Sequence, residues 1–275
     1  MIKKVLIGLD STPYTDTAIR HAVGLAKTYS VELTGVAVVH SSKLESVGPV
    51  PIGGSYYAKN LREFRMSETE QHVSEVIGKF EAACNAEGVS FNVKRETGNP
   101  FDLMVSYARY HDLTILSMRH PFEYGVIEES KNLLCQLIKE GVQPILACGG
   151  EFRSIKRALI AYNGSMESAT AMKRFVQTRL WYDAEIRIVY FGKEDTKSRQ
   201  ILEDASAYCR TFGFSPDIAL IEKDAKEGLL AYATEWTADM IVMGNSGLNP
   251  LVSQFFSDTT LHAIKYADRT LFLAQ

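Results

Sequence analysis

Lys3-Lys-Val-Leu-Ile-Gly-Leu-Asp10 and Ile155-Lys-Arg-Ala-Leu-Ile-Ala-Tyr-Asn163 are two versions of one pattern in this 275-residue chain. Each has a basic start, an apolar run as long as a buried strand and a polar residue that ends the run. Apolar residues at helical spacing follow in both, from Ala18 to Ala26 and from Ala169 to Val176. Each stretch therefore predicts a strand that leads through a turn into a helix, and the recurrence predicts an internal duplication.

Later parts of the chain repeat as well, which extends the duplication to whole domains. Cys84-Asn-Ala-Glu-Gly88 matches Cys209-Arg-Thr-Phe-Gly213, where a glycine is expected to end a helix in the left-handed conformation. A third strand is expected after each glycine. Strands that alternate with helices form parallel sheets through right-handed crossovers. The predicted fold is α/β: two tandem copies of an open five-stranded parallel sheet with helices on both faces. The other strands are expected at 33–39, 112–118 and 144–147 in the first copy, and at 186–191, 239–243 and 270–274 in the second.

The two copies are expected to occupy residues 1–150 and 151–275, joined by a short linker at about 148–154. So short a linker predicts that the copies pack together as an intramolecular pseudo-dimer. Equivalent residues are 153 positions apart at the first strand (10 to 163) and 127 apart at the fourth (112 to 239), so the first copy holds about 26 additional residues. We expect these at 41–68, where glycines and prolines predict an irregular loop. A surface insertion is favoured there over a lid.

Composition excludes several classes of protein. The formal net charge of −3 and the pI of about 6.1 leave no basic excess for binding the phosphates of a nucleic acid. No apolar run approaches the roughly 20 residues of a membrane-spanning helix, and the N-terminus does not resemble a secretory signal. We therefore expect a cytoplasmic protein without membrane contact. The four cysteines lack CxxC spacing and are expected in the core, and the six histidines form no helical pair that would predict a metal site.

Two polar residues mark where a ligand could bind. In an open parallel sheet, ligands bind beyond the carboxyl ends of the strands, where helix N-termini and loop amides converge. Asp10 and Asn163 directly follow the first strand of each copy. Thr12 and Ser165 are the expected helix caps, with Pro13 as the first helical residue of the first copy. Asp10 and Asn163 are either turn residues or hydrogen-bond partners for a base or a ribose.

A glycine-containing stretch after the fourth strand of the second copy is another candidate. Met243-Gly244-Asn-Ser-Gly247 leads toward Ser257-Asp258-Thr259-Thr260, where a helix is expected to begin. Glycines let backbone amides approach a phosphate closely, and a helix N-terminus adds its positive end. Taken alone, such a pattern is more often only a turn.

Together these features resemble the universal stress protein family, over essentially the whole chain and in both copies. The family pattern is G-x2-G-x9-G-[ST], in which the glycines and the hydroxyl hold the phosphates of ATP and an early aspartate contacts the adenosine. The resemblance implies a Rossmann-like fold of the adenine nucleotide alpha hydrolase type. It also implies a cofactor-binding site in the second copy that is formed by Ala161, Asn163, Gly164, Ser165, Val189, Gly244, Gly247, Ser257, Asp258, Thr259 and Thr260, with Asp10 as the corresponding residue of the first copy.

The second copy departs from the family pattern at the start of the last helix. Ser257 and Asp258 stand where the family has a glycine and a hydroxyl residue. A carboxylate a few ångströms from a phosphate costs on the order of several kcal/mol at an effective dielectric constant of about 20. Asp258 therefore opposes a triphosphate unless a cation such as Mg²⁺ intervenes.

The first copy departs further. Its glycines are replaced by Met118-Arg119-His120-Pro121-Phe122-Glu123, and Glu128-Glu-Ser-Lys131 occupies the later part of the motif. Pro121 lacks an amide proton, so the phosphate cradle is expected to be lost. Arg119 and Lys131 either pair with a ligand anion or form surface salt bridges.

No catalytic constellation is visible, because Ser165 has no neighbouring histidine in the sequence and the Walker A, GxSxG and HRD patterns are absent. The leading hypothesis is a stress-response regulatory protein, not an enzyme, that binds an adenine nucleotide such as ATP in at most one site, in the second copy. The alternative is a partner-binding or structural module whose pockets no longer take nucleotide. Slow ATP hydrolysis is a third hypothesis. A homodimer or an unidentified protein partner is compatible with each of them.

Overall fold

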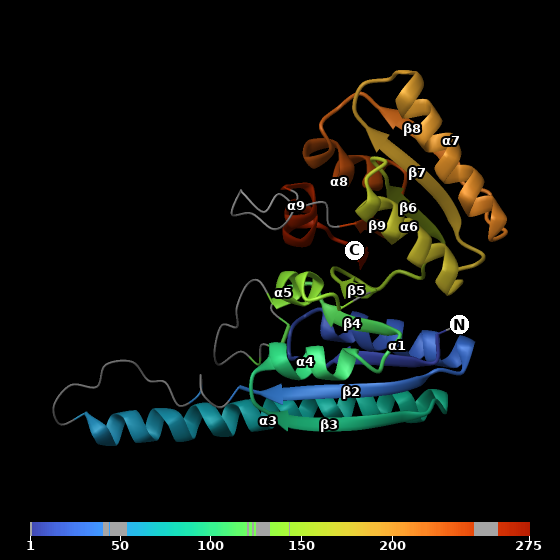
Figure 1. Cartoon of the computed structure of the whole chain (residues 1–275). Helices are drawn as coiled ribbons and strands as arrows, with labels where there is room; N and C mark the ends of the chain where they lie inside the picture. The colour runs from blue at the N-terminus through green and yellow to red at the C-terminus, as the bar shows by residue number, and fades with distance from the viewer. Residues whose placement is uncertain are drawn as a thin grey trace. The chain divides into compact units, whose positions relative to one another are not determined.

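The computed structural model describes residues 2–40, 44, 54–119, 121–122, 124, 133–142, 144–244 and 258–275, with the side chain of residue 258 left out. The chain divides into two compact units. The first unit is Lys3–Leu137, and the second unit is Ile138–Gln275 together with Ile2. Figure 1 labels their helices and strands.

The first unit is built on parallel strands in the order β3-β2-β1-β4. Because β1, β2 and β4 are almost entirely buried, they need cover on both faces of the sheet. Helices α1 and α3 pack against each other and against β2, and the right-handed crossover from β3 to β4 brings α4 to the opposite face. The elements are β1 (Lys4–Gly8), α1 (Thr15–Tyr29), β2 (Glu32–Val39), α3 (Ser55–Glu87), β3 (Phe91–Thr97), α4 (Pro100–Ala108) and β4 (Leu113–Ser117), followed by α5 (Leu133–Lys139) at the boundary between the units.

The second unit repeats this order with a fifth parallel strand, β8-β7-β6-β9-β10. The predicted five-stranded parallel sheet of the second copy is therefore confirmed. An aromatic cluster holds α6 over β10, since the ring of Phe175 lies 5.5 Å from that of Phe272 and 5.8 Å from that of Trp181. The elements are β6 (Arg157–Ala161), α6 (Met166–Thr178), β7 (Glu185–Phe191), α7 (Thr196–Thr211), β8 (Asp217–Ile221), α8 (Ala225–Glu235), β9 (Met240–Gly244), α9 (Asp258–Tyr266) and β10 (Thr270–Ala274).

Strand β5 (Ile145–Cys148) forms at the place in the sequence where the fifth strand of the first copy is expected. It belongs to the second unit and pairs antiparallel with β10, where Leu146 lies opposite Phe272. Both strands are fully buried, and their pairing satisfies backbone groups on β10 that would otherwise form an open edge. The division between the compact units falls after Leu137.

One hydrogen-bonding arrangement recurs in both units and supports the duplication. Asp112 Oδ2 accepts from the backbone amides of Lys3 and Lys4 at 2.7 and 2.9 Å. Asp239 Oδ2 accepts from the amides of Lys156 and Arg157 at 2.8 and 2.9 Å. Each carboxylate thus links the turn before the fourth strand of its copy to the start of the first strand, which lies beside it.

The expected irregular loop at 41–68 is wrong for residues 55–68. These residues form the beginning of α3, a helix of 33 residues that starts directly after Gly54. The segment between Tyr57 and Met66 contains many good helix formers, and they outweigh the glycines and prolines that precede it. Figure 1 shows the N-terminal half of α3 extending beyond the strands of the first unit. Residues 41–43 and 45–53 lie outside the described part of the chain.

The predicted helix ends are partly confirmed. Ser165 caps α6, since its side chain accepts from the amide of Ser168, and Gly88 and Gly213 have the expected left-handed conformation, with φ of 63° and 86°. The expected cap at Thr12 is wrong, because α1 begins at Thr15 and Thr12 contacts Asp10 instead. Pro13 is accordingly in the turn before the helix.

The four cysteines are all buried with free thiols, as expected from their spacing. Burial raises the pKa of Cys84 and Cys135 to about 11 and that of Cys209 to about 12. Helices long and apolar enough to cross a membrane are absent from the described residues.

Candidate functional site

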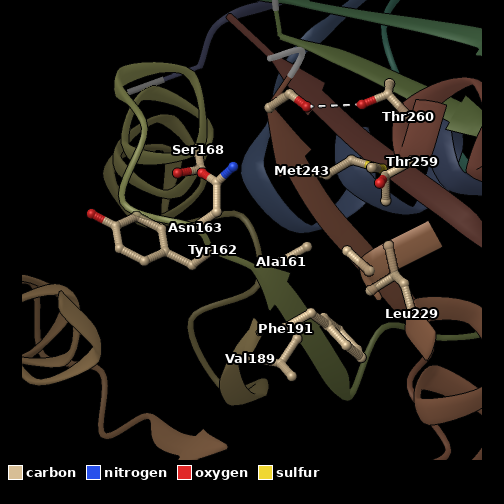
Figure 2. A pocket seen from close by; sticks show the side chains of 12 residues that line it. Ala161, Tyr162, Asn163, Ser168, Val189, Phe191, Leu229, Met243, Thr259 and Thr260 are labelled. Atoms are coloured by element: carbon tan, nitrogen blue, oxygen red, sulfur yellow. Dashed lines mark hydrogen bonds between the residues drawn. The ribbon is translucent and has the colours of Figure 1, made fainter. Parts of the chain in front are cut away.

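The second unit contains a pocket at the carboxyl ends of β6, β7 and β9 (Figure 2). The empty space within it is about 510 Å³, which includes space open to solvent. The lining residues are Ala161, Tyr162, Asn163, Ser168, Val189, Phe191, Ala225, Leu229, Met243, Gly244, Thr259 and Thr260. We call it the second-unit pocket.

Half of these residues were expected from the sequence. The second-unit pocket brings together Ala161, Asn163, Val189, Gly244, Thr259 and Thr260. Gly164 and Ser165 stand next to it, in the turn that begins α6, without lining it. Gly247, Ser257 and the side chain of Asp258 lie outside the described residues. Asp10 lies in the first unit.

Asn163 combines the two roles that the sequence left open. Its Oδ1 accepts from the amide of Ser165 at 3.0 Å, which is the hydrogen bond of a turn residue. The side chain is nevertheless exposed and lines the second-unit pocket. One lone pair of Oδ1 is thereby engaged, and the amide nitrogen of Asn163 is a donor that it can offer to a ligand.

Gly244 is needed for a close approach between β9 and α6. A Cβ atom at this position would lie 2.3 Å from the carbonyl oxygen of Glu167 and 2.7 Å from the amide nitrogen of Ser168. The carbonyl oxygen of Gly244 also accepts from Thr260 Oγ1 at 3.2 Å, the dashed line in Figure 2. Gly244 therefore joins the first turns of α6 and α9 at one side of the pocket.

Helix starts surround the second-unit pocket. Ser168 lies in the first turn of α6, Ala225 is the first residue of α8, and Thr259 follows the first residue of α9. The N-terminus of a helix carries a partial positive charge and favours anions. Val189, Phe191 and Leu229 provide an apolar wall. The pocket thus combines a surface suited to a flat apolar group with positions that favour negative charge.

Sequence reasoning missed six lining residues, for reasons that differ among them. Phe191 and Met243 are at the ends of predicted strands, so the rule that ligands bind at carboxyl ends would have found them. Leu229 lies one turn into α8 and reaches the pocket only through the packing of that helix, which no local pattern indicates. The six residues are Tyr162, Ser168, Phe191, Ala225, Leu229 and Met243.

Asp10 has different surroundings from Asn163. It is completely buried, and its Oδ1 accepts from the amide of Thr12 at 3.1 Å, from the Thr12 hydroxyl at 2.7 Å and from Ser117 Oγ at 3.0 Å, and also from the Thr15 hydroxyl. Among the described residues its Oδ2 has no hydrogen-bond partner. Burial raises the pKa of this carboxyl, and the hydrogen bonds from Thr15, Thr12 and Ser117 oppose that rise.

The strand register corrects the alignment of the two glycine-motif regions. Val5 pairs with Leu113 in the first unit as Ala158 pairs with Met240 in the second, so Ser117 occupies the position of Gly244. Arg119, expected there as a possible anion partner, donates to the Tyr14 hydroxyl at 3.1 Å. Lys131, His120, Glu123 and residues 128–130 lie outside the described part of the chain.

Metal ligands are not gathered in the described part of the chain, where no three or more His, Cys, Asp or Glu side chains lie together. The side chain of Asp258, expected to matter for a nucleotide-bound cation, is not among those described.

Comparisons with known proteins agree with the fold. A universal stress protein of Synechocystis sp. is 21% identical over an alignment of 280 positions, which covers 96% of each protein. The crystal structure of a universal stress protein from Archaeoglobus fulgidus covers 99% of this chain and 98% of its own, with 14% identity and a TM-score of 0.71. A functionally unknown protein from Pseudomonas aeruginosa covers 99% of this chain and 92% of its own, with 13% identity and a TM-score of 0.62.

The sequence model described as Universal stress protein family matches residues 1–121 and 191–273, which together make up most of the chain. These two segments include all four parallel strands of the first unit and, in the second, the strands from the end of β7 to β10. The chain therefore belongs to the universal stress protein family.

Proposed function

We propose that the second unit binds an adenine nucleotide in the second-unit pocket and that the chain acts as a regulatory binding protein, not as an enzyme. The observation that carries this proposal is the meeting of an apolar wall with several helix starts in one pocket. The wall of Val189, Phe191 and Leu229 suits a purine base, which buries its flat faces against apolar side chains. The helix starts suit the charge of a phosphate.

The polar residues of the pocket support the same ligand. The amide group of Asn163 is a donor for an acceptor on the base or the ribose. Thr259 contributes a hydroxyl at the start of α9, beside Gly244. Pairs of acid–base groups with strongly shifted pKa values, which would favour hydrolysis, are not found among the described pocket residues.

Asp258 governs how many phosphates the site tolerates. It is the first residue of α9, where a carboxylate interacts favourably with the positive helix end and opposes an anionic ligand. Asp258→Ser together with Ser257→Gly should strengthen ATP binding about tenfold or more, since 1.4 kcal/mol corresponds to that factor. If Mg²⁺ instead bridges Asp258 and the phosphates, the same change weakens binding only in the presence of Mg²⁺.

Calorimetric titration with ATP, with and without Mg²⁺, tests the proposal directly. Ala225→Trp places a large ring at the start of α8 beside the pocket and should weaken ATP binding at least tenfold. Ala231→Trp is the matched control, because Ala231 is an exposed residue of the same helix that does not line the pocket. Equal affinities for the two variants would contradict the proposed site. Undetectable binding by the unaltered chain in both conditions would refute nucleotide binding.

A partner-binding module is the second candidate, favoured by the exposed aromatic residues of α3. Tyr57, Leu61 and Phe64 follow one another at helical spacing, and the side chains of Tyr57 and Phe64 are 82% and 61% exposed. An apolar stripe of this kind is typical of a surface that binds another protein. Tyr57→Ser with Phe64→Ser should abolish any concentration-dependent dimer of the chain in light scattering. An unchanged dimer would exclude this stripe as its interface.

We also propose that the two copies occupy residues 1–150 and 151–275, that they pair as an intramolecular pseudo-dimer and that the protein is cytoplasmic.

A further inference from the structure

The first unit has a tyrosine hydroxyl at the carboxyl ends of its first two strands. Tyr124 is buried, and its Oη donates to the carbonyl oxygen of Leu9 at 2.7 Å. The same atom accepts from the backbone amide of Val38 at 3.1 Å. Leu9 directly follows β1, and Val38 is near the end of β2. The Tyr124 Oη atom is therefore the hydrogen-bond partner of one backbone carbonyl and one backbone amide at the ends of these strands.

Strand register shows what occupies the same place in the second unit. Gly8 pairs with Val36 in the first unit as Ala161 pairs with Val189 in the second. The next hydrogen bond is equivalent as well, from the Leu9 amide to the Val36 carbonyl at 2.8 Å and from the Tyr162 amide to the Val189 carbonyl at 2.9 Å. Counting two residues on, Val38 corresponds to Phe191. The Tyr124 hydroxyl thus stands where the second unit has its pocket.

Phe122 occupies the adjoining space. It is buried and has a left-handed backbone conformation, with φ of 64°, which a phenylalanine rarely adopts. Its ring atom Cζ would lie only 2.9 Å from a Cβ on Gly8. The equivalent residue of the second unit, Ala161, has a Cβ and lines the pocket. Gly8 therefore leaves the room that the Phe122 ring fills.

We propose that Phe122 and Tyr124 form an internal plug in a base-binding position of the first unit, and that removing the plug opens this position to an adenine nucleoside. The class of ligand rests on the proposed function of the second unit. The edge of adenine presents an amino donor beside a ring nitrogen acceptor, and the Tyr124 hydroxyl makes the same two hydrogen bonds with one atom. The plug explains how the first unit keeps the strand ends of a ligand site while burying them.

Hydrogen exchange at the Val38 amide tests the plug in the full chain. In the unaltered protein this amide should be protected, and Tyr124→Phe, which keeps the ring and loses the hydroxyl, should speed its exchange at least tenfold. Ala37, paired with Arg95 of β3, is the internal reference and should not change. Tyr208→Phe is the matched control, because Tyr208 has an exposed hydroxyl that accepts from Gln177 in the second unit. Unchanged exchange at Val38 in Tyr124→Phe would overturn the proposal.

Adenosine is the probe for the ligand, since it has the base and no phosphate. Tyr124→Ala should exchange quickly at Val38, and millimolar adenosine should slow that exchange several-fold, with no such effect on the unaltered protein. Phenol is the control for a filled cavity. Slowing by phenol but not by adenosine would overturn the base-binding position. If Tyr124→Ala does not fold, Tyr124→Leu is used in its place, because it also removes the ring and the hydroxyl that bonds to Val38, and failure of adenosine to slow Val38 exchange in this variant counts equally against the proposal.

This result is independent of the test for the second unit. Val38 reports only on the first unit, whereas ATP binding and its loss in Ala225→Trp report on the second-unit pocket. If adenosine slows exchange at Val38 while the unaltered chain binds no ATP, the plug stands and the proposed function fails. If ATP binds but adenosine never affects exchange at Val38, the proposed function stands and the base-binding position of the first unit fails.

Discussion

The two units have the same strand register, but the space beyond the carboxyl ends of their strands is a pocket in the second unit and is filled by side chains in the first. Asn163 is exposed at the edge of a pocket, whereas Asp10 is completely buried among hydroxyl groups. Gly244 in the second unit corresponds to Ser117 in the first, and Ser117 donates to Asp10. A duplicated backbone can therefore keep its geometry while a few side chains decide whether its strand ends form a pocket or a core.

The largest effect is expected at Gly244. Gly244→Ala would place a Cβ 2.3 Å from the Glu167 carbonyl oxygen, and because that atom belongs to the backbone, α6 must shift. We expect a loss of about 3 kcal/mol in the free energy of unfolding of the second unit, measured by urea denaturation. Gly24→Ala is the control, since Gly24 is an exposed helical glycine with nothing within 4 Å, and it should gain about 0.5–1 kcal/mol. A neutral Gly244→Ala would mean that β9 and α6 are not in this close contact.

Gly8→Ala should have a smaller effect, because the obstacles are side chains. The added Cβ would lie 2.5 Å from Leu116 Cδ2 and 2.9 Å from Phe122 Cζ, and both side chains can move. We expect a loss of about 1–2 kcal/mol from crowding in the first unit, seen in the same denaturation experiment. The reciprocal change Ala161→Gly should cost only about 0.5–1 kcal/mol, the usual penalty of a strand glycine. Greater stability of Gly8→Ala would show that Phe122 does not fill this space.

The pH dependence of stability should distinguish position 10 from position 163. Burial raises the pKa of Asp10 in the folded state above its ordinary value of 3.8. The folded protein therefore holds this proton more tightly, and the contribution to stability is full below about pH 3.8 and is lost as the pH rises through the raised pKa. Asp10→Asn, which has no carboxyl here, should gain stability relative to the unaltered protein as the pH rises.

The matched change Asn163→Asp adds a carboxyl at the equivalent position, and the effect of this carboxyl on stability as the pH rises should have the opposite sign to that of Asp10. Its carboxylate would be exposed at the start of α6, where the helix end favours negative charge. The variant should therefore become more stable, by a few tenths of a kcal/mol, as the pH rises and the group ionises. Thermal unfolding between about pH 4 and pH 8 measures both trends. The same sign at both positions would show that Asp10 is not buried as described.

The smallest difference is expected where the two copies agree. Cys84 and Cys209 stand at the same helix end in each copy, and burial raises their pKa values to about 11 and about 12. Because the thiolate is the reactive form, both should react with a thiol reagent at neutral pH at least tenfold more slowly in the native than in the unfolded protein. Fast labelling of one of them, read by mass spectrometry of peptides, would reveal a local opening of that copy.

The sequence predicts those parts of the fold that depend on local signals. Apolar runs give the parallel strands, Ser165 is a true cap, and Gly88 ends its helix as expected. The start of α3 was missed because glycines and prolines mark a boundary but not how far a loop continues. The expected cap at Thr12 is wrong because the Thr12 hydroxyl donates to Asp10, a contact that depends on tertiary structure.

The candidate site is predictable to a similar depth. Residues directly after strands, such as Asn163 and Gly244, follow from the rule that ligands bind at carboxyl ends. Leu229 and the hydrogen bonds of Tyr124 do not follow from it, because they depend on which helix or loop returns to the strand ends. A buried hydroxyl that bonds to backbone atoms has no sequence pattern of its own.

The antiparallel pair of β5 and β10 has a consequence for the order in which the chain can fold during synthesis. All four strands of the first unit are complete before β5 leaves the ribosome, so that unit can form from what has already been made. Strand β5 pairs with a partner more than a hundred residues further on, as Leu146 with Phe272, and it has to wait while the other described elements of the second unit are translated. The nascent chain thus carries an apolar strand whose partner β10 has not yet been synthesised. We therefore expect β5 to be a segment that chaperones bind during synthesis.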